Sequence, residues 1–166
     1  MYAQFSVKIY NIALSYLQNI TDAEEVTQDV FMTVYHKIDG FKQDAKLGTW
    51  IYRITANTAL NFIKKRKRNQ LMSLGLLTKQ PADFNHPGVI LEHKEEASEL
   101  FKQIDDLAPN QKTAFILVYI EGLPQQEVAT IMETTVKAVE SLLQRGKTKL
   151  KNNINFYLPT KGKRKH

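Results

Sequence analysis

Apolar residues recur at intervals of three and four along most of this chain, and no segment alternates apolar with polar residues as a β-strand does. The spacing predicts amphipathic helices over residues 3–18 and 22–38, and a third helix from residue 49 to residue 65 or beyond. Thr21 and Glu24 match a capping box at the start of the second helix. The predicted fold class is therefore all-α.

The character of the sequence changes after residue 68. Residues 69–90 contain glycines and prolines, and their apolar residues show no clean helical period. These features indicate a flexible linker over residues 69–95. We predict two small helical domains, residues 1–68 and 96–158, followed by a basic tail over 159–166. In the second domain a short helix, a turn at 133–135 and a longer helix have the layout of a helix-turn-helix.

The charge distribution indicates a polyanionic partner. The formal net charge is +6, and two basic segments, residues 1–68 and 109–166, flank an acidic middle. A solvated surface on a basic protein would give the same totals. The chain has no cysteine, which excludes disulfides, thiolate zinc sites and cysteine nucleophiles. Without a signal peptide or a membrane-spanning stretch, it is expected to be soluble, cytoplasmic and not inserted in a membrane.

One stripe of the third predicted helix combines side chains suited to nucleic acid. Cations neutralise phosphates, amides read base edges, and an aromatic ring stacks on an unpaired base. A solvated face with the aromatic residue half-buried is the alternative. The residues expected to pack inward are Ile51, Ile54, Thr58 and Phe62. The stripe, within an arc of about 80°, is Trp50, Arg53, Asn57, Asn61, Lys64 and Arg68.

The last predicted helix, capped by Thr134 or Thr135, also has a polar outer face. Helix pairs with this spacing occur in plain bundles too, so the pattern alone does not establish DNA binding. Its inner positions are Val139, Leu143 and Leu150. Its outer positions are Lys137, Ser141, Gln144, Arg145 and Thr148.

Catalysis finds little support in the sequence. Among the scattered histidines, only His93 with Glu96 has a spacing that would face one metal ion, and chance explains that spacing better. A glycine-rich phosphate loop and a nucleophile elbow are both missing. We expect a protein that is not an enzyme and needs no cofactor or metal.

Three motifs, in order, resemble those of the bacterial sigma factors of the extracytoplasmic-function group, the short members of the sigma-70 family. Residues 22–31 are similar to region 2.2, and residues 49–57 to regions 2.3 and 2.4. Leu107-Ala-Pro109, Glu121-Gly-Leu123, Gln126-Glu-Val-Ala129 and residues 139–145 are similar to region 4. Order and spacing agree over roughly residues 3–152.

The resemblance implies a protein that binds core RNA polymerase, recognises promoter DNA and helps to open it. It also implies an anti-sigma protein that holds the factor inactive. The implied polymerase contacts are Glu25, Gln28, Asp29 and Met32. The implied contacts for reading and melting the −10 element are Phe41, Lys42, Trp50, Tyr52, Arg53, Asn57, Asn61, Lys64, Lys65 and Arg68. The implied −35 contacts are Lys137, Glu140, Ser141, Gln144, Arg145, Lys147 and Lys149.

The sequence departs from the family pattern in several places of the second domain. The recognition surface that begins at Glu140 and Ser141 is less basic than in many members. Pro124 replaces a helix-capping serine or threonine, and Glu133 stands where the turn usually has glycine, which predicts a turn that is either strained or differently shaped. Two other classes stay open. A helix-turn-helix regulator acting without polymerase would not need the stripe on the third helix. A magnesium-dependent nuclease would need converging carboxylates, which the sequence does not place on one face.

Overall fold

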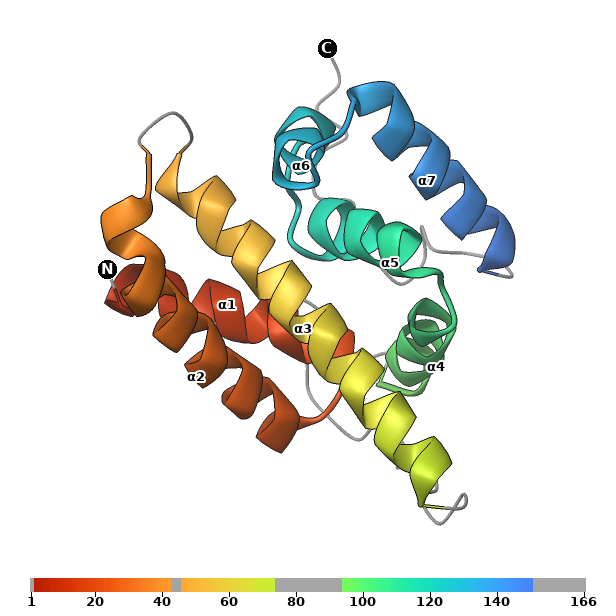
Figure 1. Ribbon diagram of the computed structural model, residues 1–166. Helices are drawn as coiled ribbons and strands as arrows, with labels where there is room; N and C mark the ends of the chain where they lie inside the picture. The colour runs from red at the N-terminus through yellow and green to blue at the C-terminus, as the bar shows by residue number, and fades with distance from the viewer. Residues whose placement is uncertain (1, 43–45, 74–93, 151–166) are drawn as a thin grey trace. The chain divides into compact units, whose positions relative to one another are not determined.

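The chain divides into two helical units. The computed structural model describes residues 2–42, 46–73 and 94–150, with the backbone alone for residue 2 and residues 94–96. All regular elements in these ranges are helices (Figure 1). The units comprise Met1–Phe84 and Asn85–His166. The predicted all-α fold with two helical domains is therefore confirmed. Most of the predicted linker, the basic tail and the His93 position lie outside the described residues.

Over its described residues, the N-terminal unit consists of three helices that pack against one another (Figure 1). They are α1 (Tyr2–Leu17), α2 (Ile20–Lys37) and α3 (Leu47–Met72), with a 3-10 turn, η1 (Ile38–Gly40), after α2. The apolar faces predicted for the first two helices are buried. Residues spaced by three or four share one face of a helix, and in α1 and α2 that face packs into the core. The core side chains include Phe5, Ile9, Ile12, Tyr16, Ala23, Val26, Val30 and Val34.

The corner between α1 and α2 differs from the prediction. Gln18 turns the chain with a left-handed backbone, φ 53°. The Asn19 side chain then caps α2 by accepting the Asp22 backbone N–H at 3.0 Å. The predicted capping box is wrong, because Thr21 already lies inside the first turn of the helix. Asn19, directly before the apolar Ile20, serves as the cap, so α2 begins two residues earlier than predicted.

Helix α3 is longer than predicted and packs on a different face. It begins at Leu47 and continues to Met72, so the first residues of the predicted linker are helical. Of the four positions expected to pack inward only Ile51 is buried, and the other three are half-buried. Small side chains on the core face of α3 allow α1 and α2 to approach it closely. A core face of this kind lacks the large apolar residues by which a buried face is recognised in a sequence. The buried residues of α3 are Thr49, Ile51, Tyr52, Thr55, Ala56, Ala59 and Ile63.

The C-terminal unit contains α4 (Lys94–Asp105), α5 (Pro109–Phe115), α6 (Gln125–Ile131) and α7 (Val136–Lys149). A π-helical turn, η3 (Ile116–Ile120), extends α5, and Gly122 ends it with φ 69°. Helix α7 packs against both α5 and α6. The core side chains include Phe101, Ile104, Phe115, Ile116, Leu117, Val128, Ile131, Val139 and Leu143.

The ion pair between Lys112 and Asp105 is partly enclosed. Lys112 on α5 is only 3% exposed, and its Nζ lies 3.3 Å from Asp105 Oδ1 at the end of α4. A buried ammonium is unfavourable without a partner, so this pair ties α4 to α5. Among the described residues, no helix is both long and apolar enough to cross a membrane.

Candidate nucleic-acid interface

The stripe predicted on α3 lies opposite the buried face of the helix. Tyr52, Ala56 and Ala59 point into the core, and at about 100° per residue the stripe is on the other side. Asn57, Asn61, Lys64 and Arg68 are exposed, and Trp50 and Arg53 are half-buried. The described surface of α3 therefore presents amides and cations to solvent along one line.

An aromatic pair marks the N-terminal end of this stripe. The rings of Phe41 and Trp50 lie with centroids 4.8 Å apart at an angle of 36°. Both rings remain half-buried, and the adjacent Lys42 is exposed. Residues 43–45 of the intervening loop lie outside the described residues. The pair provides an aromatic surface beside the amides of α3, which is the combination that an unpaired base requires.

Tyr52 is the one residue of the implied −10 set that the structure removes from the surface. Its side chain is 6% exposed and belongs to the core face of α3. It lies two positions after Trp50, so the helical turn directs it to the opposite side. We therefore correct its expected role from a DNA contact to a core residue.

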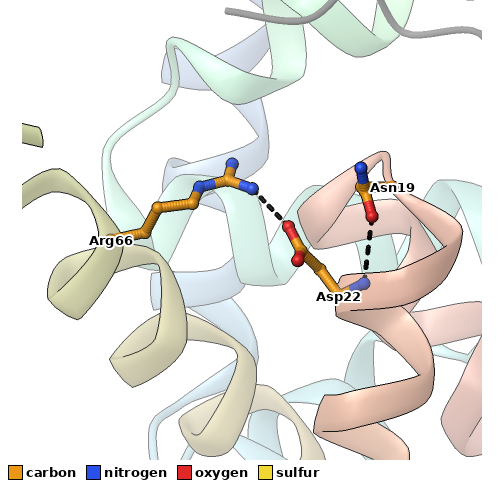
Figure 2. A network of polar contacts seen from close by, with 3 residues as sticks. All are labelled: Asn19, Asp22 and Arg66. Atoms are coloured by element: carbon orange, nitrogen blue, oxygen red, sulfur yellow. Dashed lines mark hydrogen bonds and ion pairs between the residues drawn. The ribbon is translucent and has the colours of Figure 1, made fainter. Parts of the chain in front are cut away.

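The basic run at residues 64–68 divides between two directions, and Figure 2 shows the one taken by Arg66. Lys64, Lys65 and Arg68 are exposed. Arg66 instead reaches across to α2, where its Nη1 donates to Asp22 Oδ2 at 2.5 Å. This pair between two helices was not predicted from the sequence. The helical spacing does indicate the direction of Arg66, because Arg66 follows Ala59 and Ile63 on the buried face of α3.

The outer face of α2 carries the four residues with an implied role in polymerase binding. Glu25, Gln28 and Asp29 are exposed, and Met32 is 57% exposed. The neighbouring Tyr35, at 74%, extends the apolar part of this face. An exposed apolar group bordered by acidic and amide groups is typical of a protein-binding surface.

Helices α6 and α7 form the predicted helix-turn-helix, which packs through Val139 and Leu143. Thr135 caps α7 by accepting the Ala138 N–H at 3.1 Å. Glu133 in the turn has φ 55°, which confirms the strain predicted from the missing glycine. Pro124 precedes α6 without a side-chain cap.

The outer surface of α7 is polar and is available to a ligand. All the residues with an implied −35 role are exposed, namely Lys137, Glu140, Ser141, Gln144, Arg145, Lys147 and Lys149. Lys147 lies at the edge, with its Nζ 5.0 Å from the centroid of the Tyr119 ring. This cation–π contact holds against Tyr119 one of the cations that the family resemblance places among the −35 contacts.

Two family models match the chain. One described as Sigma-70 region 2 covers residues 1–69, and one described as Sigma-70, region 4 covers residues 98–150. The ECF RNA polymerase sigma factor SigW of Bacillus subtilis is 27% identical over 155 residues, covering 89% of this chain and 83% of that protein. The corresponding SigE of Mycolicibacterium smegmatis is 27% identical over 152 residues. That alignment covers 91% of this chain and 59% of SigE, so the chain spans less than two thirds of that relative.

Solved structures show the same fold. The sigma factor RpoE of Bartonella quintana, in complex with the anti-sigma factor NepR, gives a TM-score of 0.66 at 21% identity, over 89% of this chain and 90% of that one. CnrH in complex with the cytosolic domain of CnrY gives 0.61 at 23% identity, over 89% and 80%. The two family models fall on the two helical units in the order region 2, region 4, and the chain therefore belongs to the sigma-70 family, in its extracytoplasmic-function (ECF) group.

Proposed function

We propose that this chain binds core RNA polymerase and directs promoter-specific transcription initiation. The observation that carries the proposal is the stripe on α3, where amides and cations are exposed opposite the core. A helix-turn-helix alone would not require that stripe. The site of action is the cytoplasm, where polymerase and DNA are found.

The polymerase contact is assigned to the outer face of α2. Its acidic and amide groups, Glu25, Gln28 and Asp29, suit a basic partner, and the exposed Met32 supplies apolar contact area. The charge reversal Asp29→Lys is outward and leaves the core untouched. It should weaken binding to core polymerase by about 2–5 kcal/mol if the contact is desolvated.

The −10 element is assigned to the surface formed by Phe41, Trp50 and Asn57. A base leaves the duplex at a cost of about a few kcal/mol and needs a stacking surface and an edge-reading group in return. Asn57→Ala should therefore reduce open-complex formation, measured by permanganate reactivity of unpaired thymines. Binding of duplex DNA by the C-terminal unit should not change. An equal loss with every base at the flipped position would assign Asn57 to the backbone instead.

The −35 element is assigned to α7, where the N-terminal residues of the helix reach base edges. Glu140 accepts a hydrogen bond from the amine of cytosine, so Glu140→Ala should relax preference at one position by about 1–3 kcal/mol. Lys149→Ala should weaken binding evenly across sequences and lower the salt slope by about 1. Selection from randomised upstream elements separates the two. An identical consensus for wild type and Glu140→Ala would remove Glu140 from base reading.

An anti-sigma protein is the expected regulatory partner. The sigma factor RpoE of Bartonella quintana, which has this fold, is described in complex with the anti-sigma factor NepR. A protein of this kind would compete with polymerase or DNA for the exposed surfaces of the two units. Addition of the partner should then release the chain from core polymerase in a competition titration.

Gel filtration with core polymerase tests the proposal and separates it from the regulator alternative. The wild-type chain should coelute with the enzyme, and Asp29→Lys should coelute less. Asp39→Lys makes the same charge change at an exposed position of η1, outside the proposed contact, and should behave as wild type. A chain that binds duplex DNA and does not coelute with core polymerase would be a regulator acting without it.

A further inference from the structure

Arg66 belongs to the basic run of α3 but does not face the direction of its neighbours. It follows Ala59 and Ile63 on the core side of the helix. Its side chain is 40% exposed, and its Nη1 reaches Asp22 Oδ2 at 2.5 Å (Figure 2). Lys64 and Arg68 are exposed on the other side. The cation most central to the run is therefore engaged within the protein.

The carboxylate that receives Arg66 is itself held in place. The Asp22 backbone N–H donates to the Asn19 side chain, which fixes the first turn of α2 (Figure 2). A negative charge in that turn is stabilised by the partial positive charge of the helix N-terminus. The Asp22 side chain is 22% exposed, less than that of Arg66. Asp22 is thus a fixed anchor on α2 for a long side chain from α3.

The anchor lies where α3 extends beyond the core. Ile63 is the last buried residue of the helix, and α3 continues to Met72. Leu71 and Met72 are 83% and 78% exposed, so apolar packing does not hold the last turns. A helical end without packing frays, because isolated turns are marginal in water. The Arg66–Asp22 pair ties this end to α2.

We propose that Asp22 and Arg66 are positioning residues that brace the basic end of α3 against α2. The brace keeps Lys64, Lys65 and Arg68 in a fixed row for the backbone of the duplex, and Arg66 itself takes no phosphate. The inference rests on the proposed function, because it assigns DNA binding to α3. It also links the helix that faces DNA to the helix that carries the polymerase face.

The salt dependence of DNA binding tests the role of Arg66. The full chain is titrated with a fluorescein-labelled duplex of mixed sequence at several salt concentrations. Loss of one phosphate contact lowers the slope of log K against log salt by about 0.9. Lys64→Ala should show this decrease. Arg66→Ala should have the same slope as the control variant Lys8→Ala, which removes an exposed cation from α1. A slope for Arg66→Ala equal to that of Lys64→Ala would overturn the proposal.

The affinities test whether the pair acts as one unit. Asp22→Ala should weaken duplex binding by about two- to fivefold relative to Asp39→Ala, which removes the same charge from η1. The double variant Asp22→Ala/Arg66→Ala should lose no more than Arg66→Ala alone. Asp22→Ala binding as tightly as Asp39→Ala, or additive losses in the double variant, would contradict the brace.

Hydrogen exchange of the free chain tests the brace without DNA. Amides of residues 64–72 should exchange faster in Asp22→Ala and Arg66→Ala than in the two controls, and amides of α1 should not change. Unchanged exchange at 64–72 would overturn the inference even if duplex binding is normal. If the wild-type chain fails to bind the duplex at low salt, the proposed DNA role of α3 is wrong, and the exchange data still decide whether the brace exists.

Discussion

Gly146 occupies a position in α7 where the structure favours alanine. It is buried in the helix interior, and a Cβ built there would lie 3.9 Å from Leu107 Cδ1 and 3.9 Å from Phe115 Cδ2. These are ordinary van der Waals distances, so the methyl group fits without displacing its neighbours. Gly146→Ala gains about 1 kcal/mol from helix propensity and up to about 0.8 kcal/mol from the buried methyl group. The expected stabilisation of the C-terminal unit is therefore about 1–2 kcal/mol.

The chain contains an internal reference for this measurement. Its single tryptophan, Trp50, lies in the N-terminal unit, so tryptophan fluorescence follows that unit and far-UV circular dichroism follows both. Gly146→Ala should raise the thermal midpoint of the C-terminal component by about 4–8 °C per kcal/mol and leave the fluorescence midpoint unchanged. Ser141→Ala, at an exposed position of α7, reports the gain in propensity without the packing. An unchanged or lower midpoint for Gly146→Ala would refute the reasoning, since it would mean that the backbone at this position opposes a side chain.

Three further predictions concern stability. Glu133→Gly should relieve the left-handed backbone at φ 55° and stabilise the C-terminal unit by up to about 1 kcal/mol, measured by urea unfolding, whereas Glu133→Ala should give no such gain. Asp105→Asn removes the carboxylate whose Oδ1 lies 3.3 Å from the buried Lys112 ammonium, and should cost about 1–3 kcal/mol in the free energy of unfolding. This cost should exceed that of Lys112→Met, which removes the buried charge itself, and an equal or smaller cost would contradict the prediction. Burial, with a further contribution from Glu24, raises the pKa of the Tyr10 phenol above 10.0 in the folded chain. As the pH rises above 10, the unfolded chain therefore loses this proton before the folded chain does, and the free energy of unfolding falls. This fall should be shallower in Tyr10→Phe, and identical curves of unfolding free energy against pH for the two proteins would rule out a contribution from Tyr10.

Helices whose faces are separated clearly by residue type were predictable from the sequence. In α2 the valines at 26, 30 and 34 recur every four residues, and all of them are buried. In α7 the predicted inner residues Val139 and Leu143 are buried, and the predicted outer residues are exposed. The strain at Glu133 also followed from residue type alone, because left-handed backbone favours glycine.

The errors arose where tertiary contacts override local pattern. The core face of α3 uses alanines and threonines, such as Ala56 and Ala59, whose small size permits close helix packing but gives a weak apolar signal. Tyr52 entered the −10 set through the family resemblance, whereas its helical register places it in the core. The Arg66–Asp22 pair joins residues 44 positions apart, a separation at which helical periodicity carries no information about pairing.

Initiation by the purified components tests the central claim most directly. Core RNA polymerase is incubated with and without the chain on a pool of random-sequence templates, and the 5′ ends of the transcripts are sequenced. The account predicts that the chain directs transcripts to start at discrete positions, preceded by two shared sequence elements at −10 and −35. Starts that are the same with and without the chain would contradict it, even if the chain binds duplex DNA tightly.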